Sequence, residues 1–188
     1  MSTFLASYNL LHELGINPSK VYVKVPEICL GLPGYDCKLK KNDVLPLYDL
    51  FYGKFVCPFL THLAILLTNG TDAAMLLAQT MGYFLCFPMP TDGSVDKFDF
   101  YDYPCTKPLY PSSAHFNLKF VAHMRQLKFA TNPALSLNTV YSTATGVTPL
   151  TNTTTISDLL KLSKVFFRNS LAEKILKSSC YHSSVLDS

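Results

Sequence analysis

The chain has 188 residues, of which 48% are hydrophobic and only 15% are charged. This composition excludes wholesale disorder and predicts one domain, with or without a tail, that is large enough to bury a core. The sparse charge also predicts that a partner covers part of the surface, whether a second copy, a permanent protein partner or a membrane.

The formal net charge of +3 conceals an uneven distribution. Residues 1–102 contain ten acidic residues and seven lysines, whereas residues 103–188 contain three acidic residues and nine lysines or arginines. A basic C-terminal part indicates contact with RNA, another polyanion or anionic lipid, or head-to-tail attraction between copies.

The N-terminal stretch lacks the basic region and the continuous apolar region of a secretory signal. This predicts an intracellular, cytoplasmic protein without a signal peptide. The six cysteines are then expected to be free thiols and not a disulfide framework.

Ser2 or Thr3 can cap a first helix that ends before Gly15, where a residue without a Cβ suits the left-handed backbone that closes a helix. Between Lys20 and Val25 the valines alternate with other residues, which predicts a half-buried strand. Farther along, Asp43 is expected to cap a short helix that runs from Val44 to Tyr52 and contains Pro46 in its first turn.

Cys37 lies beside Lys38, Lys40 and Lys41, whose ammonium groups can stabilise a thiolate and lower the pKa of the thiol. It is therefore the best nucleophile candidate in the chain, with Cys105 as a second. The alternative is an ordinary loop thiol, since no orienting base can be identified near it in the sequence. A thiol-dependent enzyme that uses Cys37 or Cys105, with His115 or His182 as the base, is accordingly kept as the third functional hypothesis.

The stretch from Phe55 to Phe87 is almost entirely apolar and is expected to form the core. Pro58 can open one helix, an Asn-Gly pair ends it, and Thr71 or Asp72 can cap a second helix. The fold is thus predicted to be mainly α, a helical bundle around this apolar αα-hairpin, with minor β structure near 20–25 and possible strands in 95–103 and 135–150.

A membrane offers a different interpretation of the hairpin. Each half is shorter than the roughly 20 apolar residues that a spanning helix needs, so the hairpin could enter a membrane only as a re-entrant loop. The second functional hypothesis is therefore a membrane-associated protein that is anchored by residues 55–87.

An acidic segment rich in aromatic residues follows the hairpin. Its aromatic rings alternate with aspartates, as expected for an extended arm that inserts rings into a neighbour or for a loop folded over its own core. The residues assigned to this interaction arm are Phe98, Phe100, Tyr101 and Tyr103.

The stretch KFDFYD, from Lys97 to Asp102, is similar to the Phe-Asp-Phe-Phe-Asp-like stretch of flexible filamentous plant-virus coat proteins. That similarity implies a helical protein that binds RNA and polymerises through extended arms. Those coats also carry an upstream arginine that partners the aspartate, whereas this chain has no arginine before Arg125. No family is assigned from these six residues.

Ser112 or Ser113 can cap a basic helix that runs to about Ala130 and exposes Arg125 and Lys128 on one face. The residues that follow are rich in Ser, Thr and Asn and could form a flexible linker or a hairpin of weak edge strands, of which a poorly packed connection is favoured. The predicted parts are a helical core domain (1–135) with an acidic aromatic loop (91–111), a Ser/Thr-rich connection (136–156), and a basic C-terminal helix and tail (157–188).

The last helix is expected to start near Ser157 and to bury an arc of Leu159, Leu162, Val165 and Phe166. On its other side, three cations recur at i, i+3 and i+7, within about 60° of one another on a helical wheel. These cations are Lys161, Lys164 and Arg168. Such a strip is typical of a phosphate-binding face, although solvated helix surfaces also carry lysines.

The favoured function is a non-enzymatic interaction or assembly protein, a class that includes viral structural and accessory proteins. Its basic C-terminal helices are predicted to bind RNA or another polyanion through Arg125, Lys128, Lys161, Lys164 and Arg168. No catalytic residue, metal site or cofactor is predicted, because the chain lacks the glycine loops, nucleophile elbow and paired metal-ligand motifs that would indicate one.

Overall fold

The computed structural model describes residues 1–34, 37–53, 70–87, 108–126, 138–146 and 152–178. Within them, the chain is mainly helical with one two-stranded antiparallel sheet, which confirms the predicted fold class. The elements are α1 (Ser2–Glu13), β1 (Tyr22–Lys24), the 3-10 helix η1 (Glu27–Cys29), β2 (Val44–Pro46), α2 (Leu47–Gly53), α4 (Thr71–Cys86), α5 (Ala114–Gln126), α6 (Ile156–Phe167) and α7 (Ser170–Lys177).

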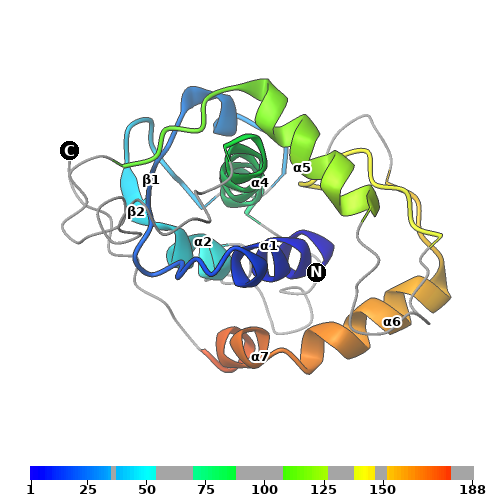
Figure 1. The fold of residues 1–188 in the computed structure, drawn as a ribbon. Coiled ribbons are helices and arrows are strands. Elements are labelled where there is room, and N and C mark those ends of the chain that lie inside the picture. The colour runs from blue at the N-terminus through cyan, green and yellow to red at the C-terminus, as the bar shows by residue number, and fades with distance from the viewer. Residues whose placement is uncertain (35–36, 54–69, 88–107, 127–137, 147–151, 179–188) are drawn as a thin grey trace.

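Helix α4 is the centre of the fold (Figure 1). Its side chains are buried on nearly all sides, including the polar Gln79 and Thr80. The Thr80 hydroxyl donates to the Leu76 carbonyl of its own helix, which satisfies a polar group that burial would otherwise penalise. The second half of the predicted hairpin is therefore a core helix, while its first half, residues 55–69, lies outside the described residues.

Helix α5 crosses α4 at very short range. A Cβ atom built on Gly82 would lie only 1.8 Å from the carbonyl oxygen of Phe116, so no larger residue fits at this crossing. The ring of Phe116 then packs edge-on against Tyr83 and Phe87, with ring centroids 5.5 and 6.2 Å away. At its start, the Ser113 hydroxyl accepts the N–H of His115, as predicted for a capping serine.

The strand predicted between Lys20 and Val25 is confirmed, but it pairs with a segment that was predicted to be helical. Val44–Pro46 forms β2 and pairs antiparallel with β1, Val23 opposite Leu45, so the helix predicted over 44–52 begins only at Leu47. Pairing with β1 outweighs local helix signals here, and Pro46, which has no N–H, is tolerated at the strand end. Asp43 does not cap that helix; its carboxylate accepts the N–H of Lys40 in the preceding turn.

Helix α1 supplies the aromatic centre of the core. The Phe4 ring meets the rings of Phe51 in α2 and Phe166 in α6 edge-on, with centroids 5.3 and 5.2 Å apart. Gly15 follows the helix with φ of +66°, the left-handed conformation expected at that position. The predicted serine or threonine cap is wrong, since Met1 is the N-cap and Thr3 is buried, donating instead to the Ala144 carbonyl.

The Ser/Thr/Asn-rich connection is better ordered than the sequence suggests. Val140 and Thr153 form an antiparallel bridge, and the Asn152 side chain accepts the N–H groups of Ser142 and Thr143. Tyr141 is buried, and its hydroxyl donates to the Ser2 hydroxyl. The expectation of a poorly packed connection is wrong for residues 138–146, where Tyr141, Thr143, Ala144 and Thr145 are buried, whereas residues 152–155 are exposed and are held by hydrogen bonds of their side chains.

Helices α6 and α7 run beside α1 and α2 (Figure 1). The Thr155 hydroxyl caps α6 by accepting the N–H of Asp158, and Asn169 caps α7 in the same way. Leu162 and Phe166 of α6 and Ile175 of α7 belong to the same hydrophobic core as α1 and α4. The domain boundaries themselves stay a prediction.

Several predicted features lie outside the described residues. They are the possible strand in 95–103, the interaction arm of Phe98, Phe100, Tyr101 and Tyr103, the C-terminal tail, and Lys128. Among the residues that are described, no helix combines the length and the apolar character that crossing a bilayer requires.

Candidate polyanion-binding surface

The cationic strip of α6 consists of Lys161, Lys164 and Arg168. The helix is fixed on its inner side by Leu162 and Phe166, both buried, so the strip points away from the core. Lys164 and Arg168 are exposed and Lys161 is half-buried. Arg168 occupies the C-cap position, directly after the last helical residue, which keeps it in register with the two lysines.

No carboxylate of the described chain forms an ion pair with the cationic strip. The only acidic residue on α6 is Asp158, which is buried and accepts a hydrogen bond of 2.9 Å from the Thr139 hydroxyl. Its charge is thus held on the inner face of the helix. The outer face is left with three cations and no internal counter-charge, a suitable arrangement for an external anion.

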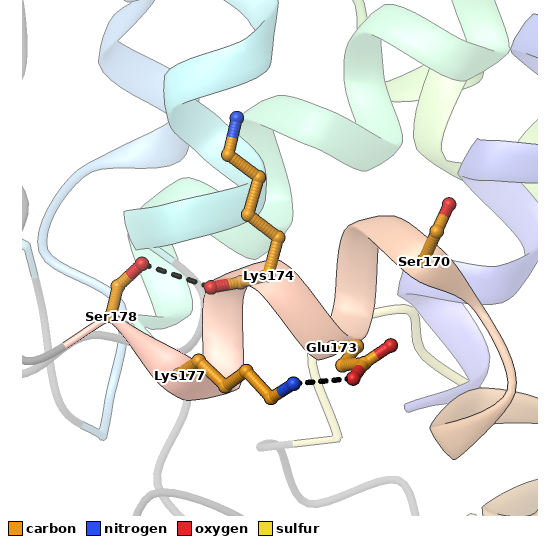
Figure 2. Close-up of a pocket in the computed structure, with 5 residues that line it drawn as sticks. All are labelled: Ser170, Glu173, Lys174, Lys177 and Ser178. Carbon is orange, nitrogen blue, oxygen red and sulfur yellow. Dashed lines mark hydrogen bonds and ion pairs between the residues drawn. The ribbon is translucent and has the colours of Figure 1, made fainter.

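The lysines of α7 are arranged differently (Figure 2). Lys177 forms an ion pair of 2.5 Å with Glu173, and this neighbour lowers the pKa of the glutamate. Lys174 points the other way, with its ammonium group 5.8 Å from the centre of the Tyr48 ring. These two lysines therefore already have partners, so α7 is a weaker candidate than α6 for binding an anion.

An open depression of about 460 Å³ lies along α7. Its described lining is Ser170, Glu173, Lys174, Lys177 and Ser178, which come from a single helix and its C-cap (Figure 2). The Ser178 hydroxyl donates to the Lys174 carbonyl, so it too is used within the helix end. Among these lining residues, neither serine hydroxyl is hydrogen-bonded to the side chain of Glu173 or of a lysine, the contact by which a base would activate it.

An apolar strip borders the cationic strip on α6. Ile156, Leu160 and Phe167 are 79, 67 and 51% exposed. At 100° per residue they fall within about 40° of one another, and the nearest member of the cationic strip follows about 40° farther round the helix. This strip is not among the features predicted from the sequence, although the i and i+4 spacing of Ile156 and Leu160 outside the buried arc is a usable signal for it.

The buried arc of α6 is also narrower than expected. Leu159 was predicted to be buried, but it is 41% exposed and extends the apolar surface on the other side of Ile156. Val165 is half-buried. The inner face of the helix is completed instead by the polar side chain of Asp158.

Arg125 is not brought to the cationic strip by any contact among the described residues. It is exposed near the end of α5, and its Nε–H donates to the Tyr141 carbonyl at 2.5 Å. One of its donors is therefore committed to holding the Ser/Thr-rich connection against α5. Whether its other N–H groups bind an anion stays a prediction.

The backbone of Cys37 is held by the carboxylate of Asp72. Its backbone N–H donates to both oxygens of Asp72, at 2.8 and 3.0 Å. The same buried carboxylate accepts the N–H of Leu39 at 3.2 Å and of Ala73 at 2.8 Å. Asp72 therefore holds the backbone at Cys37, Leu39 and Ala73 together, and an activated thiol at Cys37 stays a prediction.

The other described thiols do not strengthen the enzyme hypothesis. Burial and, to a smaller extent, the Asp72 charge raise the pKa of Cys29 to about 12, so this thiol is neutral at physiological pH. His115, one base considered for a thiol mechanism, is exposed on α5 and has no described contact with a cysteine. Cys105 and His182 lie outside the described residues.

No protein-family model matches this sequence, and no curated protein sequence resembles it significantly.

Proposed function

We propose that this chain is a non-enzymatic interaction protein that binds a polyanion through the cationic strip of α6. The observation that supports the proposal is the combination of three cations on one helix face with the state of the carboxylates on α6 and α7, where Asp158 is buried and Glu173 is paired with Lys177. Phosphates bind such a face through charge, largely without regard to sequence. RNA is one candidate polyanion, because the similarity of KFDFYD to RNA-binding coat proteins is consistent with it.

Counterion release predicts how strongly the binding constant should depend on salt concentration. Three phosphate contacts on a single strand predict that log K falls with log salt with a slope of about −2. The three contacts are also expected to act together, since loss of one cation leaves its neighbours within reach of the same strand. Reversal of all three charges is therefore a sharper test than single substitutions.

The test compares wild-type protein with the K161E/K164E/R168E variant in binding to a fluorescent single-stranded RNA. The variant is expected to lose binding at least 100-fold at low salt and to show no salt slope. K119E, which reverses an exposed lysine on α5, is the matched control and should stay within about threefold of wild type. Unchanged binding by the triple variant would refute the proposal.

We also propose that the chain self-associates through the interaction arm, which lies within residues 91–111. Substitution of Phe98, Phe100, Tyr101 and Tyr103 with serine is expected to reduce self-association, as light scattering would measure. A mass that is unchanged by these substitutions, or a monomeric wild type, would remove the interaction arm from the account while leaving polyanion binding intact.

A further inference from the structure

The outward surface of α6 combines two chemistries that one ligand must satisfy. The apolar strip of Ile156, Leu160 and Phe167 exposes most of its side-chain area, and the cationic strip runs beside it along the same helix. An exposed apolar patch of this kind marks an interaction surface when it is contiguous and bordered by polar groups. The adjoining cations indicate that the occupant carries negative charge.

We infer that α6 docks on the anionic headgroup surface of a lipid bilayer. The apolar strip enters the boundary between headgroups and acyl chains, while Lys161, Lys164 and Arg168 contact lipid phosphates and carboxylates. Buried Leu162 and Phe166 keep the helix attached to the protein core on its other side. This inference rests on the proposed function, because it names the polyanion that the cationic strip binds.

RNA would contact the cationic strip but would leave most of the apolar strip without a partner. Its backbone offers phosphates to the cationic strip, and its bases stack on aromatic rings, of which the apolar strip has one, Phe167. The aliphatic side chains of Ile156 and Leu160 have no partner of that kind in RNA. A bilayer interface supplies apolar contact and negative charge side by side, in the arrangement that α6 presents.

A second copy docked through the same face is disfavoured by charge. A twofold contact places the same surface patch on both subunits, so two cationic strips would meet. A head-to-tail contact needs an acidic patch, and the described surface has little to offer. Of the described acids, Glu27 and Glu173 already form ion pairs, Asp49, Asp72 and Asp158 are buried and Asp43 is half-buried, which leaves a single further exposed carboxylate, Glu13.

The experiment measures flotation of the full chain with vesicles of phosphatidylcholine containing 30% phosphatidylserine, next to RNA binding by the same preparations. Wild type is expected to float with these vesicles and not with pure phosphatidylcholine. The I156S/L160S/F167S variant should lose vesicle binding at least tenfold and keep RNA binding within threefold. The L118S variant is the control, since Leu118 is 65% exposed on α5 and should change neither.

The outcomes separate polyanion binding by the cationic strip from docking of α6 on a lipid surface. The K161E/K164E/R168E variant should lose both ligands; if wild type binds RNA but not anionic vesicles, the lipid inference is wrong and the proposed function survives. Binding to neither ligand overturns both. Equal vesicle binding by wild type and the serine variant also overturns the inference, because the apolar strip would then contribute nothing.

Folding and self-association need a parallel check. Urea unfolding of the serine variant should match wild type, since the three side chains point outward. A wild-type dimer that the serine substitutions dissociate would identify a second copy as the occupant of the apolar strip and would contradict lipid docking.

Discussion

Helices α4 and α6 use the same kinds of residue for opposite purposes. Both are rich in aliphatic and aromatic side chains, yet α4 is buried on nearly all sides, whereas α6 buries only Asp158, Leu162 and Phe166. The difference comes from their neighbours, because α4 is enclosed by α1, α2, α5 and η1, while α6 rests on the core along one face. Apolar residues on the free face of α6 therefore have a different explanation from those of α4.

This contrast separates residues that hold the fold together from residues that are available to a partner. On α4 and on the inner face of α6, truncation should lower the free energy of unfolding. On the outer face of α6, the same truncation should leave stability unchanged and alter binding. Paired substitutions, one from each class, test the distinction directly.

The largest effect is expected from adjacent phenylalanines. Phe166 is fully buried against Phe4, and Phe167, the next residue, is 51% exposed. Phe166→Ala should lower the free energy of unfolding by about 4 kcal/mol, while Phe167→Ala should lower it by less than about 1 kcal/mol. Urea unfolding at 25 °C measures both, and equal losses would show that the two faces of α6 do not differ as described.

The next effect is expected where α4 meets α5. Gly82→Ala places a methyl group into the Phe116 carbonyl, which forces the helices apart and should cost about 3 kcal/mol. The control is Gly15→Ala, where the added methyl meets nothing within 4 Å and only the left-handed backbone, at roughly 1 kcal/mol, opposes it. A Gly82→Ala protein as stable as the Gly15→Ala protein would contradict the close crossing.

A smaller effect should follow from the buried carboxylate at the start of α4. Asp72→Ala leaves the N–H groups of Cys37, Leu39 and Ala73 without their acceptor, at an expected cost of about 2 kcal/mol. Asp43→Ala removes one exposed hydrogen bond, from Lys40, and should cost about 0.5 kcal/mol. Equal thermal stability of the two variants would show that the Asp72 contacts contribute little.

The smallest effect is expected in the pH dependence of the free energy of unfolding. Burial lowers the pKa of His123 on α5, and its buried Nε2 atom has no hydrogen-bond partner. The unfolded chain therefore binds this proton more tightly, so stability should fall as the pH drops below the unfolded value of about 6.5 and should level off below the folded pKa. His123→Gln should flatten this decline between pH 7 and 5, whereas substitution of the exposed His115 should not.

The sequence predicted the elements better than their partners. The apolar run at 71–86 and the valine alternation at 20–25 identified α4 and β1, because periodicity reports local burial. The pairing of Val44–Pro46 with β1 was not predictable, since it depends on a contact across 20 residues that competes with a local helix signal. The capping role of Asp72 was similarly misread, because its carboxylate reaches the distant loop at Cys37.

The candidate site was predicted in part. The spacing of Lys161, Lys164 and Arg168 identified the cationic strip, since three residues on one helix need no tertiary information to share a face. The exposure of Ile156, Leu160 and Phe167 depends on which side of α6 meets the core, and the helical wheel alone assigned too wide a buried arc. The use of Arg125 to hold the Tyr141 carbonyl likewise depends on tertiary contacts.

Lysine footprinting in the presence and absence of a polyanion shows whether the ligand covers the cationic strip of α6. Wild-type protein is acetylated briefly at low salt, and the extent of modification at each lysine is read by mass spectrometry. Protection of Lys161 and Lys164 by bound RNA or anionic vesicles, with Lys119 unchanged, is the result that this account predicts. Equal modification of all three lysines with and without a bound polyanion would contradict it.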